Sequence, residues 1–217
     1  MNLQRLKQGF GYCLLLLFIA ACQPNKEKAT LPILGDRDTK MMLKDGESVI
    51  DTIYHTIPPF KFMDQDSLWI SQAEVKGKIY LADFFFTRCP TICPILSKNM
   101  LAIAQEFEQE PQVLILSHTI DEKYDSPAVL HEYAEKLGAP SNWRFLHGPQ
   151  EAIYHIAGKA GYFSYAQVNN DVPGGFDHSG AFTLVDKQGR VRGVYDGTKA
   201  EDALQAIQDI RKLLTED

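Results

Sequence analysis

The chain has 217 residues, of which 45% are hydrophobic and 23% charged, a composition typical of a globular protein rather than a disordered or disulfide-stapled one. It carries 28 acidic against 22 basic side chains, for a net charge of −6, and it contains no basic run; this excludes the electrostatic footprint of a nucleic-acid-binding protein. The long apolar run Tyr12–Ala21 falls short of the roughly 20 residues that span a bilayer, which excludes a polytopic membrane protein.

The N-terminal residues have the pattern of a targeting segment. Arg5 and Lys7 precede an apolar stretch over residues 12–19, and small residues follow it, which is the pattern of a secretory signal. The order Ile19-Ala20-Ala21-Cys22 also resembles a bacterial lipoprotein processing site, in which the cysteine is lipidated and becomes the first mature residue. We therefore predict a signal peptide over residues 1–21 and an exported lipoprotein anchored through Cys22, facing the periplasm or the cell exterior. The alternative is a plain secretory peptide with an unmodified Cys22.

Residues 22–46 are expected to form a flexible tether between this anchor and the folded domain. The segment starts with the polar, proline-containing sequence Gln-Pro-Asn-Lys-Glu-Lys-Ala-Thr, which cannot bury a core. The domain is then predicted to cover residues 47–217.

The domain begins with alternating strands and helices. Residues 60–63 and 68–71, separated by a polar turn, predict a hairpin, and Ile79–Phe86 is a continuous apolar run of buried-strand length. Apolar residues then recur at helical spacing from Ile95 to Phe107, and a second buried strand follows at Val113–Leu116. Residues 79–116 therefore predict a βαβ unit with parallel strands.

The second half of the domain continues this alternation. Ser126-Pro127 predicts the start of a helix that ends at Gly138, and a short strand at 143–146 is followed by a helix over 150–160 closed by Gly161. Strands are predicted at 181–185 and 191–195, with a final helix from Lys199 capped by Thr198 and Glu201. The predicted fold class is α/β, with a central sheet flanked by helices.

Cysteine usage points to chemistry rather than to structural cross-linking. Once Cys13 leaves with the signal and Cys22 is lipidated, the domain keeps only Cys89 and Cys93. The loop between them is too short for a disulfide to constrain much of the unfolded chain, so redox or metal chemistry is the expected role.

The motif Cys89-Pro-Thr-Ile-Cys93-Pro lies between the strand over 79–86 and a helix, where free backbone N–H groups and the helix dipole favour thiolates. If the segment is helical, the two cysteines share one face with Cβ atoms about 5–6 Å apart. They could then hold one metal ion together or, with slight adjustment, oxidise to a disulfide, and this geometry does not choose between them. A buried structural pair is the alternative without chemistry.

A histidine is the third candidate group. Asp177-His178-Ser179-Gly180 precedes the strand over 181–185 and follows a loop rich in Gly, Asn and Pro, so His178 is expected near the sheet edge that carries the cysteines. Two thiolates and an imidazole suit Cu(I), and the imidazole also suits Cu(II), whereas zinc would normally need a fourth ligand or an open position. His118, at the end of its strand, is either a surface hydrogen-bonding residue or a partner of the site.

These residues together resemble the Sco/SenC family of copper chaperones. The resemblance rests on the CPxxCP motif after a Phe-rich strand, on the Asp-His-Ser before a Thr-Leu-Val-Asp strand, and on an Asp-rich segment between them, and it covers about residues 50–215. It implies a thioredoxin-like fold, copper bound by Cys89, Cys93 and His178, and assistance in assembling the binuclear copper site of cytochrome c oxidase. In the Asp-rich segment Glu122 replaces a proline common in the family, so the local turn is expected to differ.

Three other functions remain as alternatives to a copper chaperone. A thiol–disulfide oxidoreductase could use Cys89 and Cys93, although such enzymes usually carry two residues between the cysteines rather than three, and a proline where this chain has Gly180-Ala181-Phe182. A peroxidase of the peroxiredoxin type needs Thr or Ser where Phe86 stands. A purely structural lipoprotein would leave the grouping of the cysteines with Asp177-His178 at one predicted edge without explanation.

Overall fold

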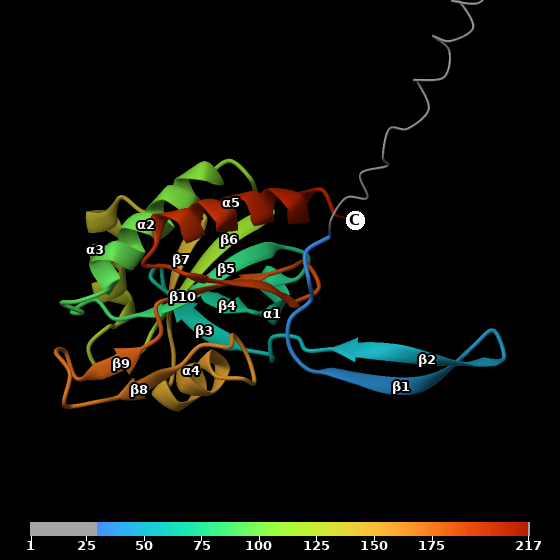
Figure 1. The fold of residues 1–217 in the computed structure, drawn as a ribbon. Coiled ribbons are helices and arrows are strands. Elements are labelled where there is room, and N and C mark those ends of the chain that lie inside the picture. The colour runs from blue at the N-terminus through green and yellow to red at the C-terminus, as the bar shows by residue number, and fades with distance from the viewer. Residues whose placement is uncertain (1–29, 217) are drawn as a thin grey trace, which may run out of the picture. The chain divides into compact units, whose positions relative to one another are not determined.

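A mixed seven-stranded sheet organises the chain, and the computed structural model describes residues 30–216 (Figure 1). Its strand order is β11-β10-β5-β6-β7-β3-β4, with β5, β6 and β7 parallel and the remaining neighbours antiparallel. The bounds of these strands are β3 Lys61–Asp64, β4 Trp69–Ser71, β5 Ile79–Phe85, β6 Val113–Thr119, β7 Trp143–His147, β10 Ala181–Val185 and β11 Val191–Asp196. The predicted α/β class and the predicted hairpin near residues 60–71 are confirmed.

Helices cover both faces of the sheet. On one face α2 packs beside α5, and Ser97 of α2 exchanges a hydrogen bond with Tyr133 of α3, while α4 lies across the opposite face (Figure 1). The helices are α1 Gln72–Val75, α2 Cys93–Glu106, α3 Pro127–Leu137, α4 Gln150–Ala157 and α5 Ala200–Leu214. None of the helices in residues 30–216 combines the length and apolarity needed to cross a membrane.

The core strand β5 explains why the fold could be predicted in outline. Every side chain of Ile79–Phe85 is buried, because the strand has a neighbour on each side and helices on both faces. Its parallel pairing with β6, through α2, confirms the predicted βαβ unit. A strand buried on both faces reads as a continuous apolar run rather than as an alternating one, which is the pattern this segment has.

Helix termini follow the predicted capping in one case and depart from it in two. Ser126 caps α3 by accepting a hydrogen bond from the Val129 N–H, and Gly138 ends it in the left-handed conformation. The helix α4 stops at Ala157, earlier than predicted; Gly161 is required for another reason, since a Cβ there would lie 2.0 Å from the Ile156 carbonyl oxygen.

The predicted capping box on the last helix is wrong. The Thr198 hydroxyl donates to the carboxylate of Asp196 instead of accepting from the helix, and Lys199 stands at the N-cap without a side-chain bond to the helix backbone. Asp202 in the first turn accepts a hydrogen bond from the Asp196 N–H, so the polar groups at this end bind one another.

The end of the predicted tether is wrong, because residues 37–54 form a hairpin. Strands β1 Arg37–Lys44 and β2 Glu47–Tyr54 pair antiparallel along their whole length and project from the main sheet (Figure 1). The turn is Asp45-Gly46, both with positive φ, which is the conformation of a tight two-residue hairpin turn. The predicted signal over residues 1–21 and the start of the tether lie outside the described residues.

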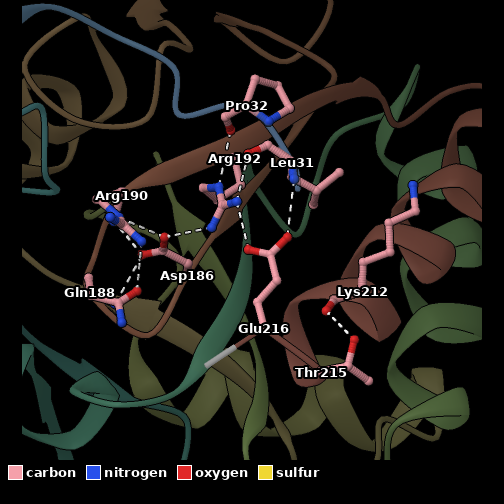
Figure 2. Close-up of polar contacts among 9 residues, drawn as sticks. All are labelled: Leu31, Pro32, Asp186, Gln188, Arg190, Arg192, Lys212, Thr215 and Glu216. Carbon is pink, nitrogen blue, oxygen red and sulfur yellow. Dashed lines mark hydrogen bonds and ion pairs between the residues drawn. The ribbon is translucent and has the colours of Figure 1, made fainter. Parts of the chain in front are cut away.

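A buried arginine joins both ends of the described chain (Figure 2). Arg192 of β11, 5% exposed, pairs with Asp186 at 3.0 Å and with Glu216 at 2.7 Å. It also donates to the carbonyl oxygens of Leu31 and Pro32, and the Leu31 N–H donates to Glu216. We call these five residues the arginine clamp. Because the guanidinium donates to two carboxylates and two carbonyls, its burial is compensated.

Replacing Arg192 with Ala is expected to lower the free energy of unfolding by roughly 3 kcal/mol, because it breaks two ion pairs of a buried arginine at once. Asp186 keeps its ion pair with Arg190, whereas Glu216 and the carbonyls of Leu31 and Pro32 lose this donor. Urea denaturation measures this loss as a lower midpoint. The matched control is Arg211→Ala, which removes an arginine paired with Glu106 on the surface and is expected to cost at most about 1 kcal/mol. Equal midpoints for the two variants would contradict a stabilising role for the clamp.

Candidate metal centre

The two cysteines lie at the junction between β5 and α2. Cys89 stands in a turn, where its N–H donates to the Phe86 carbonyl, and Cys93 is the first residue of the helix, followed by Pro94. The segment between them is therefore not helical, which corrects the assumption that both would share a helix face. Pro94 suits the first helical turn, where no intrahelical partner for its missing N–H exists. Both cysteines are free thiols in the structure and both are buried.

The Asp-rich segment after β6 holds the turn that carries Cys89. Asp125 accepts hydrogen bonds from the Thr87 N–H, the Thr87 hydroxyl and the Thr119 hydroxyl. Arg88, immediately before Cys89, forms an ion pair with Asp121 at 2.7 Å. The two aspartates noted in the sequence therefore position the cysteine turn without touching the sulfur atoms.

Glu122, at the position where the family commonly has a proline, contacts a different element. Its carboxylate accepts a hydrogen bond of 2.7 Å from the Gln150 N–H at the start of α4. The N-cap residue of that helix, Pro149, offers no side-chain acceptor, so Glu122 supplies one from a distant segment. At the position where the sequence departs from the family pattern, Glu122 therefore ties this turn to the start of α4.

His178 lies on a small hairpin that is separate from the central sheet. Strands β8 Ala166–Val168 and β9 Phe176–His178 pair only with each other, and His178 is the last residue of β9. Its Nδ1 lies 3.1 Å from the Ser179 carbonyl oxygen. Because a carbonyl can only accept, Nδ1 carries the proton and the lone pair of Nε2 faces the cysteines.

The three predicted site residues meet at one point. The Sγ atoms of Cys89 and Cys93 and a ring nitrogen of His178 all lie within 4.8 Å of one another, and the Cys93 Sγ is 3.5 Å from the His178 Nε2. Among residues 30–216 this is the one cluster of Cys, His and carboxylate groups with the spacing of a metal site. Two sulfur donors and one imidazole nitrogen converge without an intervening residue, and this set fits a soft metal ion.

The two thiols have opposite proton affinities. The hydrogen bond from the Cys93 thiol is the main reason why the pKa of Cys89 is lowered to about 3. The same interaction, with burial, raises the pKa of Cys93 well above its ordinary value. The reduced site therefore holds one thiolate, on Cys89, and one protonated thiol, on Cys93, as in pairs where one cysteine is the nucleophile.

A buried carboxyl that the sequence analysis did not single out lies in the same strand as the turn. Asp83 of β5 is 4% exposed, and its Oδ1 has no hydrogen-bond partner among the described residues. Burial raises its pKa to about 6, while a hydrogen bond from Ser117 acts in the opposite direction. Its position in a wholly apolar strand was the available signal, since an Asp there requires a reason.

His118 is neither a surface residue nor a member of the metal-ligand cluster. Its side chain is fully buried, which excludes the surface role, and it is absent from the metal-ligand cluster. The ring stacks on Phe84 and lies edge-on to Phe62, while Nδ1 donates to the Asp83 carbonyl oxygen. Burial lowers the pKa of His118 to about 4, so it is a neutral core residue behind the site.

A pocket of about 250 Å³ opens onto the cluster and gives it access to solvent. Cys89 and His178 line it together with Thr91, Ile92, Val172, Pro173, Phe176 and Asp177, and Cys93 lies behind them. The loop between β8 and β9 closes over one side of it, and Gly174, with a φ of +91°, permits this approach: a Cβ there would lie 2.8 Å from the Phe86 ring. The metal-ligand cluster is therefore buried, and the pocket connects it to solvent on one side.

A central sheet with a cysteine pair at the carboxyl end of a parallel strand, faced by a histidine, defines a thioredoxin-like protein whose site is built for thiol or metal chemistry. The family model SCO1/SenC matches residues 51–215. The chain belongs to the SCO1/SenC family, which confirms the resemblance seen in the sequence.

Known proteins of similar sequence and fold agree with this assignment. The SCO1 protein homolog of Bacillus subtilis is 31% identical over 176 residues, covering 78% of this chain and 89% of that protein. A SCO1/SenC family lipoprotein from Bacillus anthracis has a TM-score of 0.67 at 29% identity, covering 73% of this chain and 95% of that one. BsSco, reported with a disulfide switch and as a member of the Sco family of cytochrome c oxidase assembly proteins, has a TM-score of 0.64 at 29% identity, covering 75% and 95%.

Proposed function

We propose that this protein is an exported, membrane-tethered copper chaperone. It holds copper as cargo through Cys89, Cys93 and His178, and it delivers the ion to the binuclear copper site of cytochrome c oxidase or prepares the thiols of that site. The observation that carries the proposal is the convergence of two sulfur atoms and one imidazole nitrogen within 4.8 Å. Membership in the SCO1/SenC family supports the same function.

The chemistry of the donor set suits copper as cargo. Cys89 is already a thiolate, and Cys93 becomes one when it yields its proton as the metal binds. The hydrogen bond from the His178 Nδ1 to the Ser179 carbonyl orients the ring so that Nε2 points toward the two sulfurs. Cu(I) accepts two thiolates with or without a third ligand, and Cu(II) gains from the imidazole. A three-ligand site on an open pocket also leaves a position through which a recipient can take the ion.

A thiol–disulfide oxidoreductase is the second candidate, and the unequal pKa values of the two cysteines favour it. The Cys89 thiolate would attack a substrate disulfide, forming a mixed disulfide and releasing one substrate thiolate. Cys93 would then lose its proton and attack the Cys89 sulfur, releasing the second thiolate. The substrate gains two electrons and the pair loses two, ending as the Cys89–Cys93 disulfide.

One experiment separates the two functions. The reduced protein is titrated with Cu(I), and its turnover as a reductant of a disulfide substrate is measured beside it. One tightly held copper per chain with negligible turnover supports the chaperone, and rapid turnover with no copper retained supports the oxidoreductase. Tight binding together with rapid turnover would assign both activities to the same pair.

The lipid anchor makes a separate prediction. Cys22→Ser removes the residue that would carry lipid, so the variant is expected to move from the membrane fraction into the soluble fraction. Cys13→Ser is the matched control, because it changes a cysteine within the predicted signal and is expected to leave the protein in the membrane fraction. Fractionation and immunoblotting measure both. A Cys22→Ser variant as firmly bound to membranes as the unaltered protein would remove the lipoprotein assignment.

A further inference from the structure

The hairpin β1–β2 has an apolar face that nothing in the described chain covers. Cross-strand pairing places Met41 opposite Ile50 and puts Leu43 on the same face. These three side chains are 73%, 71% and 78% exposed. We call them the hairpin face. An isolated two-stranded hairpin is marginal in water, and an exposed apolar cluster of this kind marks an interaction surface.

The two faces of the hairpin differ in charge. On the opposite face Lys40 stands across from Asp51 and Lys44 across from Glu47. These charged side chains flank three apolar residues that are less exposed than the hairpin face, namely Met42, Val49 and Ile53. The hairpin face carries no charged residue between Arg37 and the turn. Both faces therefore carry apolar side chains, but only the hairpin face does so without charged neighbours, which makes it the side suited to an apolar surface.

Its size argues against a second copy of this chain as the occupant. Two strands of eight residues present a face of about 26 Å by about 10 Å, or about 260 Å². A stable protein–protein interface needs about 800 Å² from each partner. The hairpin face alone therefore cannot hold a dimer together, whereas it can add to the binding of a chain that is already held close to a surface.

The arginine clamp brings the hairpin close to such a surface. It fixes Leu31, which lies nine residues after Cys22, so a lipid on Cys22 would keep the clamp within about 30 Å of the bilayer. The hairpin starts beside the clamp, since Leu34 donates to the Val191 carbonyl and Ile57 to the Gly189 carbonyl. A hairpin about 26 Å long can reach the bilayer from there.

The metal centre lies at the other end of the sheet. Strand β10 starts at Ala181, three residues after His178, and ends at Val185, next to Asp186 of the clamp. The hairpin and the cluster of Cys89, Cys93 and His178 therefore occupy opposite ends of the central strands (Figure 1). Contact between the hairpin and a surface leaves the metal centre open.

We propose that the hairpin face, Met41, Leu43 and Ile50, is a membrane-contact surface that lies on the bilayer holding the lipid anchor and turns the metal centre away from it. The inference rests on the lipid anchor of the proposed function. Basic and acidic side chains of the hairpin are nearly balanced, so the contact is apolar and does not require anionic lipid; the charged residues are Arg37, Asp38, Lys40, Lys44, Asp45, Glu47 and Asp51.

The test uses the full chain, processed in a bacterial host, purified from membranes and reconstituted into phosphatidylcholine vesicles with or without brominated acyl chains. Leu43→Trp places a fluorophore on the hairpin face, and the emission of Trp69 and Trp143 is subtracted with the unaltered protein. Leu204→Trp is the matched control, because Leu204 is 61% exposed near the start of α5, at the end of the sheet that carries the metal centre.

Brominated lipid is expected to remove most of the emission added by Leu43→Trp and little of that added by Leu204→Trp. Co-sedimentation with the vesicles is measured in the same samples. Co-sedimentation without quenching at position 43 overturns the membrane contact and leaves the anchor standing. Blue-shifted emission at position 43 without quenching places the face against protein, such as a second copy, and also overturns the proposal. Failure to co-sediment overturns the anchor and the contact together, and copper binding is unaffected in every case.

Discussion

Oxidation of Cys89 and Cys93 to a disulfide is expected to abolish copper binding, and reductant is expected to restore one copper per chain. The thiolate sulfurs are the proposed ligands, and a disulfide offers neither of them. The two sulfurs already lie in the same cluster within 4.8 Å, so forming the bond requires only a local adjustment of the turn before α2. Equilibrium dialysis of the oxidised, reduced and re-reduced protein against Cu(I) measures the change.

Single substitutions extend this test to each sulfur. Cys89→Ser and Cys93→Ser are each expected to lose tight binding of both Cu(I) and Cu(II), because each removes one of only two soft donors. The matched control is Cys22→Ser, which removes a thiol outside the site and should bind copper as the unaltered protein does. Equal copper uptake by the oxidised and reduced forms would disprove the assignment of the cysteines as ligands.

Loss of the histidine should separate the two oxidation states of copper. His178→Ala is expected to weaken Cu(II) binding by more than the roughly 10- to 100-fold that losing an outer partner of a metal ligand costs. Cu(I) binding should weaken much less, because Cu(I) tolerates coordination by the two thiolates alone, whereas Cu(II) prefers four tetragonal positions and gains more from imidazole. Competition titrations with Cu(I)- and Cu(II)-selective chelators measure both affinities.

His131→Ala provides the matched control for this substitution. His131 lies half exposed on α3, where it pairs with Asp66 and Glu135 and is not part of the metal-ligand cluster. Its replacement should leave both copper affinities unchanged. If His178→Ala behaved in the same way, His178 would no longer count as a ligand.

Elements set by local sequence were predictable. The strand β5 and the helix α3 carry their own signals, a fully apolar run in one and a Ser-Pro start with a glycine end in the other. The hairpin β1–β2 also carries a signal, Asp45-Gly46, but its first strand and turn were assigned to the tether and its second strand to the start of the domain. Here cross-strand pairing gives regular structure to a segment that buries almost nothing.

Features that depend on distant contacts were not predictable from the sequence. His118 stands at a strand end, where exposure is common, yet the rings of Phe62 and Phe84 enclose it. The burial of His118 is decided by rings from other strands, and the local sequence around His118 does not show these contacts.

The candidate site was predicted by residue type, and its geometry was not. Cys89, Cys93 and His178 were grouped because two strand edges coincide in a parallel α/β sheet. That Cys89 lies in a turn rather than a helix follows from Asp125, which binds Thr87 from 38 positions along the chain. The unequal proton affinities of the two thiols depend on the resulting distances.

The three proposed ligands differ in how firmly the protein holds them. Cys89 and Cys93 belong to a turn tied to Asp125 and to a helix packed on the sheet, whereas His178 ends a two-stranded sheet that pairs only with itself. Movement of β8 and β9 would therefore break no hydrogen bond of the central sheet. For the proposed transfer of the ion we therefore expect the imidazole to be released first and the two sulfurs last, because only the histidine lies outside the central sheet.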